Sequence, residues 1–196
     1  MSNIDVSRLP TYAFGHRSLM YWGTMGMMAI EGTVFAIALV AYYYLRELTD
    51  LWPTRDAPPA LLYGTLNTVI LLVSAIPNQW TKKAADREDL RTVRIGLVVC
   101  MMFSIAFLIV RVFEFSALNT RWDMSAYGSI VYMLLGLHTV HLVTDAIDSA
   151  VLTVLMFTGP LEGRRFVDVS ENTLYWWFVV LSWLPIYFTI YIAPRL

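Results

Sequence analysis

The chain has 196 residues, of which 58% are hydrophobic and only 15% are charged. Soluble domains are about 45–50% apolar and about 25% charged, so this composition indicates a membrane protein rather than a soluble one. The formal net charge of -1 gives no general attraction to nucleic acid, and no nucleic-acid partner is expected. The single cysteine, Cys100, excludes an internal disulfide and a thiolate metal cluster.

The apolar residues fall into five blocks, each long enough for a helix to cross the hydrocarbon core of a bilayer. Backbone polar groups cannot stay unpaired in lipid, so each block must be a helix or part of a closed barrel. The blocks lack the alternation of barrel strands, which favours helices. The sequence therefore predicts an all-α integral membrane protein, with residues 1–196 forming a single five-transmembrane-helix bundle. The predicted helices are 21–45, 60–80, 95–115, 127–157 and 174–193.

The connections between these spans are predicted from helix-ending residues and from charge. Prolines at positions 53, 58 and 59 end the first span and keep the following link extended. Residues 81–94 are dense in charge, and residues 158–173 begin with the helix-stopping sequence Thr-Gly-Pro. The fourth span would be about 46 Å long as a helix, against a hydrocarbon core of about 30 Å. We expect it to tilt or to project into the cytoplasm.

Basic residues set the expected orientation in the membrane. With five spans, the N-terminus shares a side with the second and fourth loops, and that side carries nine Lys and Arg residues against five. The positive-inside rule then predicts a cytoplasmic N-terminus and an external C-terminus. The nine are Arg8, Arg17, Lys82, Lys83, Arg87, Arg91, Arg94, Arg164 and Arg165, and the five are Arg46, Arg55, Arg111, Arg121 and Arg195.

Ionisable side chains inside the predicted spans need an explanation, because an ionised group at a helix centre costs roughly 2.5–3.5 kcal/mol. Two of them, Glu31 and Glu114, lie on the first and third spans. The other four follow one another at spacings of three, four and three residues, which places them on one face of the fourth helix. That face is therefore expected to look into protein. The six residues are Glu31, Glu114, His138, His141, Asp145 and Asp148.

Three interpretations of the face of the fourth helix stay open. It is a polar seam that packs against other helices, a metal site, or a proton relay. Imidazole and carboxylate ligands hold zinc or iron, yet the chain has only three histidines, which is few for a di-iron enzyme or a haem pair. We predict no metal site and no catalytic residue in this chain.

Glu31 also has two interpretations. It is a structural carboxyl that is protonated or hydrogen-bonded to a neighbouring helix, or it binds a lipid headgroup or assists proton movement in a cleft. Counting residues from the span ends places Glu31 and His138 near the bilayer centre. We therefore expect these two side chains to share a polar pocket, in which a neutral histidine forms a hydrogen bond.

The remaining ionisable groups have candidate partners of opposite charge. Asp145 and Asp148 lie closer to the cytoplasmic end, where we expect them to meet Arg91 or Arg94. Glu114 follows Arg111 by three residues on the third span, a spacing that permits an ion pair on one helix face.

Five motifs follow one another along the chain, each on its own span. In this order they resemble subunit III of cytochrome c oxidase and related haem–copper oxidases, in the shorter five-helix bacterial form. The resemblance runs from the first span to the C-terminus. The motifs are IEGTVFA at 30–36, LNTVILLVS at 66–74, EF at 114–115, YGS at 127–129 with GLHTVH at 136–141, and YWWFVV at 175–180.

The chain also departs from this family. Trp177 stands where the family has His, and Val180 stands where it has Asp. Asp145 and Asp148 are extra charges. These departures indicate a divergent branch, for which an association with nitric oxide reductase is one interpretation.

The resemblance implies an accessory subunit of an aerobic respiratory complex that is not catalytic alone. Haem and copper are then expected in the partner subunits, namely catalytic subunit I and subunit II, and none in this chain. The family resemblance further implies bound phospholipid, support of proton uptake, and a multi-pass location in the bacterial inner (plasma) membrane. The residues expected to form a lipid-binding or buried polar pocket are Glu31, Glu114, His138 and His141.

Two other functions stay open. The first is an assembly or activation factor for nitric oxide reductase. The second is a free-standing membrane metalloenzyme that uses the face formed by His138, His141 and Asp145 to hold a metal.

Overall fold

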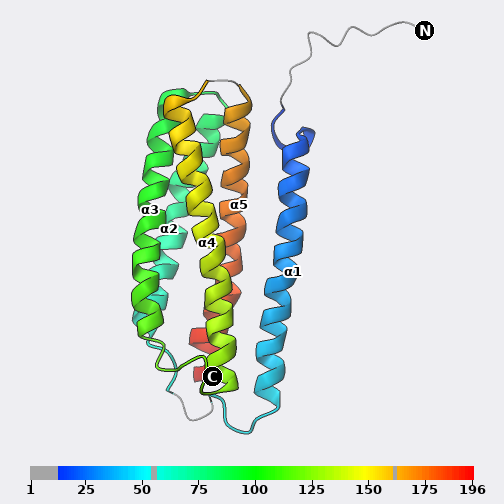
Figure 1. Ribbon diagram of the computed structural model, residues 1–196, viewed down its shortest axis with the longest axis vertical. Coiled ribbons are helices and arrows are strands. Elements are labelled where there is room, and N and C mark those ends of the chain that lie inside the picture. Colours follow the sequence, from blue (N-terminus) through cyan, green and yellow to red (C-terminus); the bar gives the residue numbers. More distant parts are fainter. Residues whose placement is uncertain (1–12, 54–56, 161–162) are drawn as a thin grey trace, which may run out of the picture.

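The computed structural model describes residues 13–53, 57–160 and 163–196 of the chain. Over these residues the protein forms a bundle of five long helices, each long and apolar enough to cross a membrane. Figure 1 shows the helices running lengthwise beside one another. The predicted fold, an all-α multi-pass membrane bundle, is confirmed. The helices are α1 (Leu19–Glu47), α2 (Leu61–Ala85), α3 (Leu90–Ser116), α4 (Ala126–Thr158) and α5 (Gly163–Tyr187).

The helices extend further than the apolar blocks that predicted them. The charged connection expected at 81–94 shrinks to residues 86–89, because α2 and α3 both continue into it. The largest error is at α5, which begins at Gly163, whereas a loop was predicted up to residue 173. Hydropathy marks the part of a helix that contacts lipid, and it gives no signal for polar turns that continue the same helix beyond that part.

The count of basic residues assumed that the N-terminus shares a side of the membrane with the second and fourth loops, and the helices are arranged in that way (Figure 1). α1 begins at the end of the bundle where α2 gives way to α3, and the C-terminus lies at the opposite end (Figure 1). Arg8 and Arg55, which entered that count, lie outside the described residues. Which end faces the cytoplasm stays a prediction.

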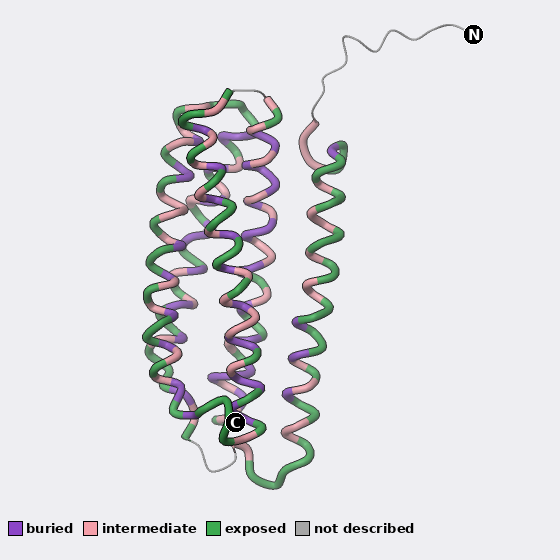
Figure 2. Tube along the Cα trace, in the orientation of Figure 1, coloured by how far each residue is buried: buried purple, intermediate pink, exposed green. Residues whose placement is uncertain are grey.

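α1 packs against the rest of the bundle through only part of its length. Its buried residues are Phe35, Ala38 and Tyr42, which lie on one face at helical spacing. Figure 2 shows these buried positions in the half of α1 nearer its C-terminal end. The other half leaves large apolar side chains exposed, as expected for a helix that faces lipid or a partner protein.

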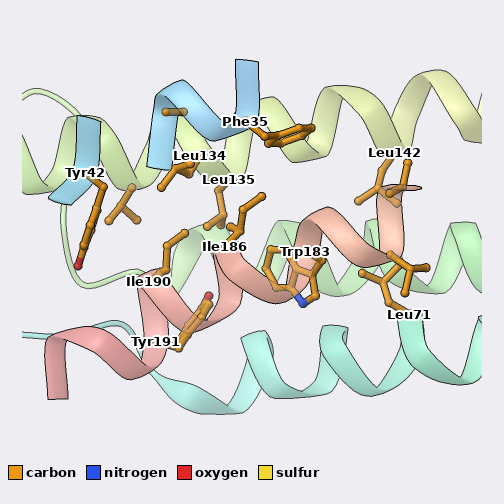
Figure 3. Close-up of a cluster of buried hydrophobic side chains, with 14 of the residues drawn as sticks. Phe35, Tyr42, Leu71, Leu134, Leu135, Leu142, Trp183, Ile186, Ile190 and Tyr191 are labelled. Carbon is orange, nitrogen blue, oxygen red and sulfur yellow. The ribbon is translucent and has the colours of Figure 1, made fainter. Parts of the chain in front are cut away.

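The apolar core lies among α1, α2, α4 and α5, with Phe107 added from α3. Trp183, Leu134 and Leu135 are completely buried at its centre. Figure 3 shows these side chains meeting between the helices. Since the core joins helices from both halves of the chain, it holds the polar groups described below in a fixed geometry.

The C-terminal end of the last span is irregular. α5 contains Pro185 and is followed by a π-helical segment, η2 (Phe188–Ile192), and a short 3-10 segment, η3 (Ala193–Arg195). This arrangement places the Tyr191 ring against Gly64 of α2. A Cβ atom on Gly64 would lie 2.4 Å from that ring, so only glycine permits the approach.

α3 begins at a capped end outside the apolar span. The Asp89 carboxylate accepts hydrogen bonds from the Thr92 backbone N–H at 3.3 Å and from the Thr92 hydroxyl at 2.5 Å. These hydrogen bonds hold the pKa of Asp89 below its ordinary value of 3.8. The cap therefore stabilises the helix above that ordinary pKa, and its contribution is lost as the pH falls through the lowered value.

Asp89→Ala is expected to loosen the first turn of α3 at neutral pH, because the orphan N–H groups of that turn lose their acceptor. Hydrogen–deuterium exchange at residues 90–94 measures the effect as a loss of protection. The difference between the variant and the unaltered protein should shrink at acid pH, where Asp89 is protonated. Equal protection at pH 7 would contradict the cap.

Candidate functional site

A buried ion pair lies on α3, where the sequence spacing predicted it. Arg111 Nη1 lies 3.0 Å from Glu114 Oε2, and each side chain is only 1% exposed. Two buried charges remain stable only when each is paired and hydrogen-bonded. The pair is therefore expected to recruit further partners from the neighbouring helices.

Those partners come from both ends of the chain. Glu114 accepts a hydrogen bond from the Asn67 amide of α2 at 2.5 Å, and another from the Tyr191 hydroxyl at 2.5 Å. On the opposite side, the Arg111 guanidinium lies over the Trp183 ring of α5 at 4.3 Å. The ion pair thus joins α2, α3 and α5 with the π-helical segment that carries Tyr191.

His138 of α4 completes this network. Arg111 Nη2 lies 3.1 Å from His138 Nδ1, and because a guanidinium has only donors, Nδ1 must be the acceptor. The other ring nitrogen, Nε2, then carries the proton and donates to the Val179 carbonyl at 3.1 Å. The geometry specifies one tautomer of a neutral imidazole.

The prediction that Glu31 and His138 share a polar pocket is wrong. Glu31 lies instead beside His141, with Oε2 at 3.6 Å from Nε2, and it accepts a hydrogen bond from the Tyr175 hydroxyl at 2.9 Å. The ring of Phe35 packs against both imidazoles. Counting residues from a span end gives the depth of a side chain and not its direction. A shift of three residues turns the side chain by about 60° around a helix, so His141 faces α1 while His138 faces α3 and α5.

A cleft of about 890 Å³ opens between the free half of α1 and the facing parts of α4 and α5. Its apolar wall includes methionines of α1 and aliphatic side chains of α4. Its polar wall combines carboxylates with two arginines from the first turn of α5. The polar residues that matter below are Glu31, Asp145, Asp148, Arg164, Arg165 and Tyr175.

The expected contact of Asp145 and Asp148 with Arg91 or Arg94 is not formed. Asp148 is exposed and accepts a hydrogen bond from the Asn172 amide at 3.2 Å. Arg94 instead donates to the Met156 carbonyl at 2.8 Å. The cations at this cleft are Arg164 and Arg165 in the first turn of α5. The sequence analysis placed both arginines in a loop, because this turn is too polar to resemble a membrane span.

The polar face of α4 therefore divides into two environments. His138 and Asp145 are buried, at 0% and 2% exposure, whereas His141 is partly exposed and Asp148 is open to the cleft. Within the described residues, no group of three or more His, Cys, Asp or Glu side chains is arranged to hold a metal ion. The metalloenzyme interpretation gains no support from this arrangement.

The sequence analysis did not identify the two hydrogen-bond donors to Glu114 from other helical segments. Asn67 is an amide within an apolar run, and that isolation is a signal that would have marked it as a partner for a buried charge. Tyr191 gave no comparable signal, because a tyrosine near the end of a span is expected at the membrane interface.

Comparison with known proteins gives similarities over most of the chain. The family model for cytochrome c oxidase subunit III matches residues 20–194. Cytochrome c oxidase subunit 3 of Thermostichus vulcanus is 23% identical over 187 residues, which cover 94% of this chain and 92% of that protein. The corresponding protein of Pylaiella littoralis is 29% identical over 147 residues, which cover 74% of this chain and 54% of the relative.

A third relative is a much longer protein than this chain. The heme-copper oxidase subunit I+III of Aeropyrum pernix is 26% identical over 187 residues, covering 89% of this chain and 22% of that protein. This chain thus spans about half of the Pylaiella protein and about a fifth of the Aeropyrum one. Because the family model covers nearly every residue from the start of α1 to the end of the chain, the chain belongs to the cytochrome c oxidase subunit III family.

Proposed function

We propose that this chain is the non-catalytic subunit III of a haem–copper terminal oxidase of aerobic respiration. In this role it packs on catalytic subunit I and adjoins subunit II, which carry the haem and copper, in a bacterial inner membrane. The observation that carries the proposal is the family match over residues 20–194. The Aeropyrum relative, whose name joins subunits I and III in one chain, supports a direct contact with subunit I.

The composition of the gently solubilised complex tests this proposal. A complex purified through a tag on this chain should contain subunits I and II, with haem and copper in fixed proportion to the chain. A complex with nitric oxide reductase would favour the activation factor instead, an interpretation suggested by Asp145, Asp148 and the departures at Trp177 and Val180. Recovery of the chain alone, with its own redox metal, would overturn both functions.

We also propose that the cleft beside α1 binds phospholipid. It opens between membrane-spanning helices and combines an apolar wall with the cations Arg164 and Arg165 at the end of the bundle. Guanidinium groups bind phosphate through paired, charge-assisted hydrogen bonds. The acyl chain would then lie along Met20, Met27 and Leu155, which line the same cleft. This position also stabilises α1, whose free half has few protein contacts.

Arg164→Gln/Arg165→Gln should reduce the phospholipid retained by the purified complex by more than half, because the phosphate loses both guanidinium partners. Lipid extraction with mass spectrometry measures the amount per complex. Lys83→Gln/Arg87→Gln is the matched control, since it removes the same charge from exposed positions at the same end of the bundle. Equal lipid loss in both double variants would assign the effect to net charge and contradict a specific site.

Support of proton uptake is the remaining part of the proposed role, and Glu31 is its candidate residue. Its carboxyl lines the cleft and contacts His141 and Tyr175. Glu31→Gln keeps the hydrogen bond from Tyr175 and removes the exchangeable proton. We expect normal assembly and severalfold slower steady-state proton uptake by the oxidase. Tyr175→Phe, which keeps the carboxyl, should retain most of the rate, and equal losses in the two variants would indicate a packing effect.

A further inference from the structure

Asp145 is a buried carboxyl on α4. Its side chain is 2% exposed, at about the middle of α4. Neither carboxylate oxygen has a hydrogen-bond partner among the described residues. Arg111 and Glu114, by contrast, are buried as an ion pair, with Nη1 at 3.0 Å from Oε2. A buried carboxyl without a protein partner indicates a bound water, ion or proton in a space between the helices.

Two cavities meet at this side chain. Asp145 lines the open cleft between α1, α4 and α5, and it also lines a small polar cavity inside the bundle. In the small cavity, the centre of a water molecule can move within a volume of about 10 Å³. An internal water needs roughly 10–15 Å³ of such volume. Its other lining residues are Ser74, Asn78, Cys100, Ser104, Ser149, Asn172 and Trp176.

The small cavity offers the polar partners that an internal water requires. The Ser74 hydroxyl oxygen accepts from the Trp176 indole N–H at 3.1 Å, and its own proton goes to the Leu71 carbonyl. The Asn78 amide N–H donates to the Thr173 carbonyl at 3.3 Å. The Asn78 side-chain oxygen accepts from the Cys100 thiol at 4.0 Å, and its second lone pair can accept from a water molecule. With Asp145, these oxygens provide the two to four contacts typical of buried water. The side chains that carry these oxygens are buried, so bulk water does not compete for them.

Several acidic side chains line the cleft together with Asp145. The acidic groups at the cleft are Glu31 on α1, Asp148 on α4, and Glu171 with Asp168 on α5. An ionised carboxylate without a cation partner is far more costly to bury than a neutral carboxylic acid, and nearby negative charge adds to that cost.

The remaining titratable groups near Asp145 supply no counterion. α3 contributes only the Cys100 thiol to the small cavity, and α5 contributes the Tyr175 hydroxyl to the cleft. Arg165 lies 3.7 Å from Asp168, and Arg164 is exposed, so neither forms an ion pair with Asp145. Lys82 and Asp86 lie beside Glu171 around a separate pocket.

We propose that Asp145 is an internal proton-binding site, whose carboxyl shares its proton with one water molecule in the small cavity and exchanges it with the cleft. The side chain stands between the two spaces and lines both. The ligand is a proton with a bound water, and the site requires no metal ion. The inference goes beyond the proposed function, because it holds whether the partner is an oxidase or a nitric oxide reductase.

Infrared spectroscopy of the purified complex tests the site directly. The spectrum of the unaltered complex minus that of Asp145→Asn should show the C=O stretch of one protonated carboxyl per chain. That band should move to lower frequency after transfer to D₂O under native conditions, because the cleft provides exchange. Asp148→Asn is the matched control on the same helix, and its subtraction should leave the protonated-carboxyl band unchanged.

Asp145→Glu keeps the carboxyl group and makes the assignment independent of a single variant. It should shift the band rather than remove it. Ionised-carboxylate bands in the Asp145→Asn difference would overturn the proposal. So would a protonated-carboxyl band that survives every change at Asp145, or one that does not respond to D₂O.

Discussion

Glu114→Ala is expected to destabilise the protein by about 3–5 kcal/mol, because it leaves the Arg111 guanidinium buried without its counterion. The same change removes the acceptor for Asn67 and Tyr191. Thermal or denaturant unfolding of the detergent-purified complex measures the effect, and loss of assembly in the membrane is the extreme form of the same result.

A double variant separates the cost of an unpaired charge from the worth of the pair. Arg111→Met/Glu114→Gln removes both charges and keeps an acceptor for Asn67. We expect it to recover much of the stability that Glu114→Ala loses, because replacing a whole buried pair is often neutral. A double variant as unstable as the sum of the single variants Arg111→Met and Glu114→Gln would show that the two side chains act independently, against the 3.0 Å contact.

Gly64→Ala should cost about 1–3 kcal/mol, the usual range for overpacking in a tightly packed interior. The new methyl group would meet the Tyr191 ring at 2.4 Å, and that ring cannot retreat without breaking its hydrogen bond to Glu114. Unfolding of the purified complex gives the magnitude.

Gly136→Ala is the natural control for this substitution. No heavy atom lies within 4 Å of a Cβ placed on Gly136, so the change should be neutral or stabilise α4 by up to about 1 kcal/mol, through helix propensity. Gly64→Ala/Tyr191→Leu should be less unstable than the two single changes together, because the shorter side chain makes room. Similar effects of alanine at both glycines would indicate that helix propensity, and not the Tyr191 contact, decides the outcome.

Much of the fold followed from residue patterns that act locally. Apolar blocks of membrane-spanning length predicted five helices, and the three-residue spacing of Arg111 and Glu114 predicted their ion pair. The ordered motifs indicated the family that the comparison then confirmed. Each of these three signals depends on neighbours in sequence or on the bilayer. None of them requires knowledge of how the helices are rotated relative to one another.

The errors and omissions have three causes: the rotation of a helix, the continuation of a helix through polar turns, and a departure from α-helical geometry. Whether His138 or His141 faces Glu31 depends on how α4 is turned relative to α1, which packing of Phe35 and Trp183 decides. The polar start of α5 is a helix because it packs on its neighbours, burying residues such as Phe166 and Val169. Tyr191 reaches Glu114 only through the π-helical segment after Pro185, and a departure from α-helical geometry has no clear sequence signature.

The hydrogen bond between Glu31 and Tyr175 has a consequence for biosynthesis. The two residues are 144 positions apart, so at about 5–20 residues per second the ribosome needs roughly 7–30 s to deliver the second after the first. During that interval the newly inserted first segment carries an acidic group whose eventual partners do not yet exist. Until the last two segments arrive, burial of this carboxyl in the membrane requires that it be protonated or be bound by a lipid or another protein.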